Sequence, residues 1–151
     1  MPAQTLWTQA ATAILTALNA PGSPATAYRA RYEAIAQAQT AFNLFPTKMA
    51  VKYSGANDSA EVEATFVVRA YTSATTQVDL VADPLVAWAW QQLRIDPTLG
   101  GVATDAYITD IEMGYVEKTS SDQICVDISI CVEMQVGRDD PTLNKMLGAN
   151  L

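Results

Sequence analysis

The chain has 151 residues, of which 50% are hydrophobic, so it can bury the core of one ordinary domain. It carries 9 Lys and Arg residues against 16 Asp and Glu residues, which gives a formal net charge of −7. This acidic balance argues against binding of nucleic acid through phosphate neutralisation, and the lack of His removes the commonest general base and metal ligand.

The first third of the chain predicts two helices. Apolar residues recur at helical spacing from about Thr5 to Asn19, and a Pro-Gly-Ser-Pro turn follows at residues 21–24. The next segment, residues 26–39, is rich in alanine and predicts a second helix. The start of the chain lacks the basic residues of a secretory signal, so we expect a protein made in a cytoplasm.

After Pro46 the hydrophobic pattern changes from helical to alternating, which predicts a strand at residues 48–53 and a second strand at 61–71. Small and polar residues between them supply the turn of a hairpin. A longer hairpin is expected from strands at residues 107–115 and 124–136, where one side of each strand is apolar. Such alternation is typical of antiparallel sheets with one face on the core.

A helix between the two hairpins has clear boundary signals. Asp83 is a candidate N-cap, Pro84 suits the first helical position, and Asp96-Pro97 ends the helix. Its longest apolar run, at residues 85–90, is too short to span a bilayer. Trp90 points about 200° away from Trp88, so it either contacts a partner subunit or packs at the edge of the core.

These elements predict an α+β fold with the order α-α-β-β-α-β-β. We expect two layers, in which a mostly antiparallel four-stranded sheet has its helices packed on one face. Residues 1–137 would form a single domain, and residues 138–151 would form a flexible C-terminal tail.

Three features could carry chemistry, and each favours a structural interpretation. Gly100-Gly101 follows a helix and precedes a strand, which is the reverse of the order in a phosphate-binding loop. Cys125 and Cys131 lie six residues apart in one strand, roughly 20 Å, which is too far for a disulfide. No cluster has the spacing of a metal site. We therefore predict no enzymatic activity, cofactor or metal.

Acidic residues form the third feature, because they gather on the polar sides of the predicted strands. A flat, solvated face favours a charged surface over a pair of catalytic carboxylates. The residues of this candidate face are Glu61, Glu63, Asp110, Glu112, Asp127 and Glu133.

The order of these segments resembles the tail terminator family of long-tailed bacteriophages, the tail-completion proteins similar to minor tail protein U. The resemblance covers about residues 5–136. It includes the first helix, the segment Tyr28-Arg29-Ala30-Arg31, the strand after Pro46, and the segment Asp96-Pro97-Thr98-Leu99-Gly100-Gly101 before the closing hairpin.

The resemblance implies a structural virion protein at the head-proximal end of the tail. Such a protein forms a hexameric ring that caps the tail tube, stops tail polymerisation and offers a docking surface to the neck. Its partners would be further copies of itself, the tail tube protein and the head–tail connector. DNA would pass through the ring without specific binding, and we expect the acidic face to line that channel.

Two alternatives remain open at this stage. One is another tail or neck component of similar fold, either a tail-tube protein, which would stack into long polymers, or a head–tail joining protein. The other is a small ligand-binding or hydrolytic α+β domain, whose site would need a pocket with a perturbed carboxylate or a reactive thiol, such as Cys125 or Cys131.

Overall fold

The computed structural model describes residues 3–30, 40–53, 58–73, 78–116 and 123–145. The α+β class is confirmed, although the sheet has five strands instead of four, in the order β1-β2-β3-β5-β4. All neighbours are antiparallel except the parallel pair β1–β2. The elements are α1 (Leu6–Leu18), β1 (Thr26–Arg29), β2 (Ala41–Tyr53), β3 (Ser59–Ser73), α2 (Val78–Ile95), β4 (Asp105–Val116) and β5 (Gln123–Gly137).

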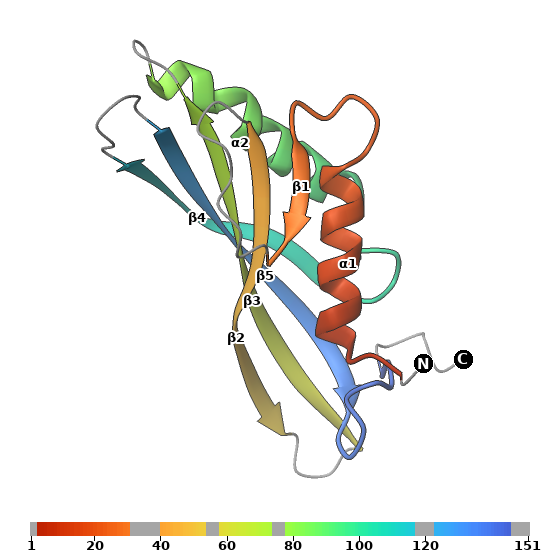
Figure 1. Cartoon of the computed structure of the whole chain (residues 1–151). Helices are drawn as coiled ribbons and strands as arrows, with labels where there is room; N and C mark the ends of the chain where they lie inside the picture. The colour runs from red at the N-terminus through yellow and green to blue at the C-terminus, as the bar shows by residue number, and fades with distance from the viewer. Residues whose placement is uncertain (1–2, 31–39, 54–57, 74–77, 117–122, 146–151) are drawn as a thin grey trace.

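Both helices pack on the same face of the sheet (Figure 1). The pair β3–β5 forms the centre of the sheet and is in register from Ser59↔Gly137 to Ser73↔Gln123. The even-numbered side chains of residues 60–72 and 126–136 point toward the helices and are buried, among them Phe66, Ile128 and Ile130. The lower ends of β2 and β3 extend beyond α1 in Figure 1, so part of the sheet is left without a helix.

The prediction of α1 is confirmed. The Thr5 hydroxyl accepts a hydrogen bond from the Thr8 N–H at 3.3 Å, which caps the first turn. Ala10, Ala11 and Ile14 lie on the buried face of the helix. Asn19 is the C-cap residue at the end of the helix.

The prediction of a helix over residues 26–39 is wrong for its first part, because residues 26–29 form β1; residues 31–39 lie outside the described part. The Asn19 amide bonds both backbone groups of Ala27, at 2.8 Å and 3.1 Å, and so holds β1 extended beside α1. β1 then pairs with β2 from Thr26↔Ala41 to Arg29↔Leu44. These long-range pairings override the helical preference of an alanine-rich segment.

β2 starts at Ala41, seven residues before the predicted strand at 48–53. Its first four residues are buried on both faces, so they do not alternate and give no strand signal. The register shifts between Pro46 and Lys48, where a bulge accommodates the proline. Beyond this bulge, Val51 and Tyr53 face the helix side and are 47% and 61% exposed.

The predicted start of the helix between the two hairpins is also wrong. α2 begins at Val78, and Pro84 lies inside it, so Asp83 is not an N-cap. Ala82 and Leu85 are both buried, which shows that the turn before the proline packs on the core. This packing compensates for the backbone hydrogen bond that Pro84 cannot donate, so the helix continues through Pro84. The helix ends at Ile95, before Asp96-Pro97, as predicted.

β4 follows the predicted hairpin, but a bulge between Ile108 and Asp110 interrupts its alternation. The uninterrupted alternation expected over 107–115 is therefore wrong. Ile108 pairs with Ile130 on the core side, whereas Tyr107 pairs with Cys131 on the polar side. Because the bulge adds one residue, the alternation of β4 reverses beyond it, and Asp110 lies on the polar side.

The paired glycines form the turn between α2 and β4, as the sequence order indicates. Leu99, Gly100 and Gly101 have φ values of 52°, 74° and 92°, a left-handed run that glycine permits. The Asp96 carboxylate accepts hydrogen bonds from the Thr98 hydroxyl at 2.7 Å and the Gly100 N–H at 2.8 Å. These bonds keep the pKa of Asp96 below its usual value, with the Thr98 hydroxyl as the largest cause.

After β5 the described chain folds back on the sheet. Asn144 forms an antiparallel bridge with Val136, and the Leu6 N–H donates to the Pro141 carbonyl at 3.1 Å. A Cβ at Gly137 would approach the Asp140 carbonyl oxygen to 2.7 Å, so this reversal requires glycine. Residues 146–151 of the predicted flexible tail lie outside the described residues.

We expect Phe66→Ala to lower the free energy of unfolding by about 3–5 kcal/mol, because it leaves a cavity in the centre of the core. Phe66 is fully buried on β3. Urea unfolding followed by tryptophan fluorescence measures the change. Glu61→Ala on the same strand is the control and should change stability by less than about 0.5 kcal/mol. Equal effects of the two substitutions would contradict this assignment of the core.

We expect Asp96→Asn to lower stability at neutral pH and to have little effect in acid. Because the folded-state pKa of Asp96 is lowered, its carboxylate stabilises the fold above its unfolded pKa, about 3.9, and this contribution is lost as pH falls through the folded value. The measurement is urea unfolding of wild type and variant at pH 7 and near pH 3. A difference that stays constant across this range would contradict the proposed role of the carboxylate.

Candidate functional site

The six acidic residues predicted for one face all lie on the side of the sheet away from the helices. Residues directly opposite on paired strands share a face, and the register aligns Glu63 with Glu133 and Asp127 with Glu112. Glu61, Asp110 and Glu112 are exposed. The structure thus brings together side chains from three strands, Glu61 and Glu63 of β3, Asp110 and Glu112 of β4, and Asp127 and Glu133 of β5.

Sequence reasoning missed other charged residues on this polar face. Asp105 pairs with Glu133 and extends the row of carboxylates, but it precedes the predicted strand at 107–115. Lys48 pairs with Thr65 and Lys52 pairs with Glu61, which puts two cations on the same face at the β2 edge. The alternation of β2 already places Lys48 and Lys52 on one side of that strand, but the predicted face included only acidic residues.

Arg69 neutralises one of the carboxylates. Its guanidinium donates to both oxygens of Asp127 at 2.7 Å and 3.0 Å, a bidentate pair that spans β3 and β5. The hydrogen bond to Asp127 is the largest cause that raises the pKa of Arg69, so this residue stays charged. The side chains are 43% and 30% exposed, and pairs in such surroundings contribute about 1 kcal/mol or less.

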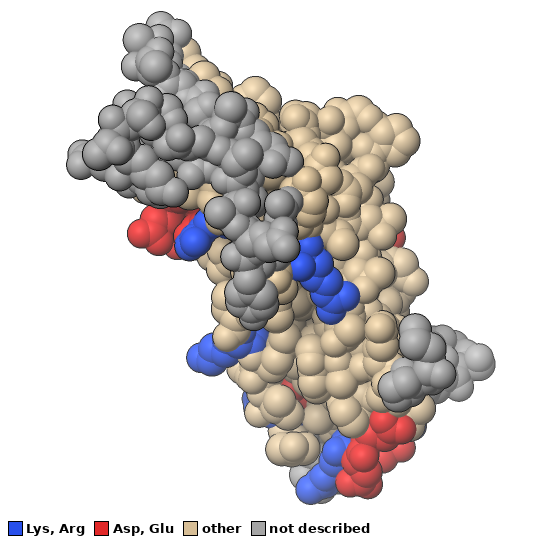
Figure 2. All heavy atoms as spheres, viewed as in Figure 1, with Lys and Arg blue, Asp and Glu red and all other residues tan. Residues whose placement is uncertain are grey.

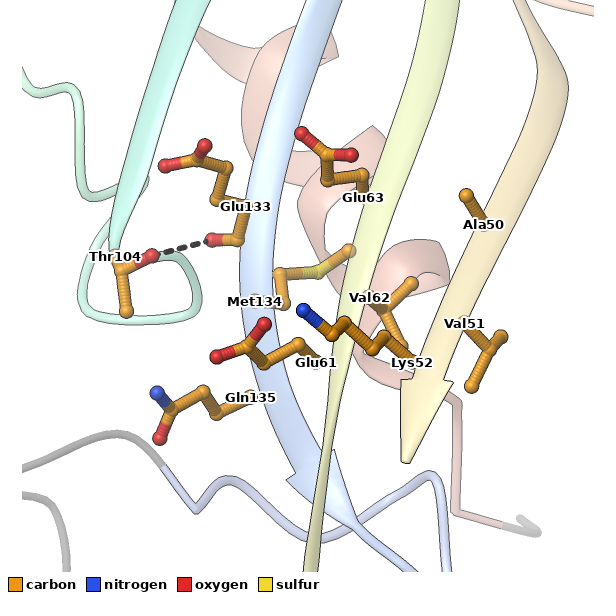
Figure 3. A pocket seen from close by; sticks show the side chains of 10 residues that line it. All are labelled: Ala50, Val51, Lys52, Glu61, Val62, Glu63, Thr104, Glu133, Met134 and Gln135. Carbon is orange, nitrogen blue, oxygen red and sulfur yellow. Dashed lines mark hydrogen bonds between the residues drawn. The ribbon is translucent and has the colours of Figure 1, made fainter. Parts of the chain in front are cut away.

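A hollow of about 410 Å³ lies on the polar face, at the end of the sheet away from Arg69. Figure 3 shows Glu61, Glu63 and Glu133 around it, with Lys52 extending from β2 across β3 toward Glu61. The Thr104 hydroxyl donates to the Glu133 carbonyl at 3.0 Å and closes one side. This hollow is polar and predominantly acidic.

Cys131 lies next to this hollow and is poorly suited to be a nucleophile. Its thiol is close to the Glu63 carboxylate, at 4.0 Å. Burial is the largest cause that raises the pKa of the Cys131 thiol, and the nearby carboxylates raise it further. Hydrogen bonding to Cys131 in turn raises the pKa of the Tyr107 hydroxyl, which also donates to Glu133 at 3.2 Å. Both groups therefore stay protonated at neutral pH.

Trp88 and Trp90 are placed differently, as their spacing indicates. Trp88 packs against the core and its Nε1 donates to the Leu18 carbonyl at 3.0 Å, which ties α2 to α1. Trp90 is 49% exposed and borders a smaller hollow of about 210 Å³ with Tyr107 and Ile108 of β4. The outward Trp90 thus lies beside the edge strand of the sheet.

The described residues hold neither a metal-binding cluster nor a membrane-spanning helix. Across residues 3–30, 40–53, 58–73, 78–116 and 123–145, no three Cys, Asp or Glu side chains converge as they would around a metal ion. In the same part of the chain, none of the helices combines the length and the apolar character needed to cross a bilayer.

Comparisons with known proteins give similarity in structure but none in sequence. No family model matches the chain, and no curated protein matches it. The fold is similar to that of a chain in a solved structure described as "Virion of native gene transfer agent (GTA) particle". The similarity covers 85% of this chain and 92% of that chain, with 18% sequence identity and a TM-score of 0.40.

Proposed function

We propose that the protein is a tail terminator, a structural virion protein that closes the head-proximal end of a long phage tail. In this role a hexameric ring of the chain caps the tail tube, stops its polymerisation and offers a docking surface to the neck. The observation that carries the proposal is the one-sided sheet, whose helices cover one face and leave an acidic face bare. The resemblance of the segment order over residues 5–136 supports the same role.

The acidic face suits the wall of a channel for DNA. Unneutralised phosphates are repelled by carboxylates, so DNA would pass such a wall without adhering to it. In the proposed ring the sheets face the channel and α1 and α2 lie outside. Glu61, Glu63 and Glu133, which surround the hollow, would then be part of the channel surface.

A ring of identical subunits needs two different surfaces on each subunit that fit each other. Trp90 is a candidate for one of them, because a half-exposed tryptophan beside an edge strand can anchor a neighbour. The contacts with the tube protein and the connector would then use the two ends of the ring.

The polar hollow raises the alternative of a ligand-binding role. Its volume is within the usual range for small-molecule sites, but such sites are mostly apolar, whereas three carboxylates surround this one. The raised pKa of Cys131 further disfavours covalent catalysis there. The structural role therefore agrees better with this surface.

Electron microscopy of the purified protein tests the terminator role. We expect closed rings of uniform diameter, because heterologous contacts that close by rotation stop growth. A tail-tube protein would instead form stacks or tubes of increasing length with concentration. Such open polymers would contradict the terminator proposal and favour the tube alternative.

The channel assignment predicts a gain of DNA binding when the acidic face is reversed. Rings of Glu61→Lys/Glu63→Lys should bind DNA at low salt and lose it as salt rises, whereas wild-type rings should not bind. Fluorescence anisotropy of a labelled DNA measures this. Asp83→Lys/Gln91→Lys, on α2, also introduces two lysines, at exposed positions outside the proposed channel. Equal binding by both variants would contradict the assignment of the acidic face to the channel.

A further inference from the structure

Both edges of the sheet have backbone that no described strand pairs with. β1 pairs only with Ala41 to Leu44 of β2, so the outer edge of β2 is open from Phe45 to Tyr53. β4 pairs only with β5, and its outer edge is open along the described strand. The open part of β2 is roughly 30 Å long at the usual rise per residue. Unpaired edges of this length are templates for another strand.

The two open edges carry opposite charges on the polar face. Lys48 and Lys52 are exposed on β2, whereas Asp110 and Glu112 are exposed on β4. Pairing of two β2 edges would bring lysines together, and pairing of two β4 edges would bring carboxylates together. Directly opposed like charges are destabilising, whereas opposite charges across a strand pair are favourable. Charge therefore favours pairing of the β2 edge of one copy with the β4 edge of another copy.

The helix-side face of the same edges is complementary in a second way. Val51 and Tyr53 of β2 are 47% and 61% exposed, and Ile111 and Met113 of β4 are each 38% exposed. The helix-side view in Figure 2 is covered mainly by uncharged side chains, and the charged ones lie mostly along its rim. A β2–β4 contact would thus bury apolar side chains on one face and pair charges on the other.

We propose that the open edge of β2 in one copy docks on β4 of the next copy and continues the sheet between subunits. This rests on the proposed ring, for which it names the two surfaces that meet. β2, β3, β5 and β4 alternate in direction, so β4 runs opposite to β2. Rotation about an axis roughly along the strands preserves these directions, and the new pair is therefore antiparallel.

Two arrangements of the new strand pair give a match of charge. Without an offset between subunits, Lys48 lies level with Tyr107, and Ala50 lies level with Asp105, which is then diagonal to Lys48 and Lys52. Tilted strands in closed sheets require an offset between neighbours, and an offset in one of the two directions brings Asp110 and Glu112 from the level of Phe45 and Asn43 toward the lysines. Trp90, beside β4 on the helix side, would lie next to this contact.

Complementary charge reversal tests the edge assignment. Lys48→Glu/Lys52→Glu makes both open edges acidic, and Asp110→Lys/Glu112→Lys makes the β4 edge basic to match β2. Each variant alone should associate at least about tenfold more weakly than wild type, because like charges then meet. An equimolar mixture should restore rings, since each open edge finds an opposite edge on the other variant. Sedimentation velocity and electron microscopy at low salt measure both effects.

Glu61→Lys/Glu63→Lys is the matched control, because it reverses two carboxylates on the central strand β3 and should leave ring formation intact. Wild-type rings together with no restoration in the mixture would overturn the edge assignment and leave the terminator role standing. Open tubes from wild type with restoration in the mixture would support the edge contact and contradict the terminator role. Absence of association in wild type and in the mixture would overturn both.

Discussion

The burial of one face of the β3–β5 pair beneath α1 and α2 is the constraint on which the rest of the structure depends. Side chains alternate strictly along a strand, so placing Phe66, Ile128 and Ile130 in the core sends their neighbours to the opposite face. A shift of one residue would bury the carboxylates of these strands at a large cost. The same hydrophobic pattern that stabilises the core therefore assembles the acidic face.

The edge strands adapt to this centre through bulges. Pro46 pairs with Phe66 and Ile108 pairs with Ile130, so both bulges lie beside the same row of core side chains. Bulges increase local twist and bend the edges, while the central pair continues without interruption. Beyond these points β2 presents Val51 and Tyr53, and β4 presents Ile111 and Met113, as exposed apolar side chains. The edge strands thus differ from the central strands in keeping exposed apolar surface that a second subunit could cover.

Much of the fold was predictable, and the errors have identifiable causes. α1 and the predicted parts of the four long strands have clear periodicity, and the acidic positions followed from it. The segment at residues 26–29 has helical composition, but the Asn19 amide and the parallel partner β2 hold it extended. Pro84 resembled a helix start because the pattern could not show that Ala82 packs on the core. Asp105 was missed because the strand begins two residues before its alternation becomes clear.

The sequence by itself determined the two-layer class, the polarity of the sheet faces and the opposed directions of Trp88 and Trp90, because period and spacing are local properties. Only the tertiary structure decided the strand order, which sets β2 and β4 at opposite edges and β3 and β5 in the centre. That order depends on pairings between residues far apart in the chain, which no local pattern encodes. It is also what separates Lys48 and Lys52 from Asp110 and Glu112, so that these charges can meet only between two copies.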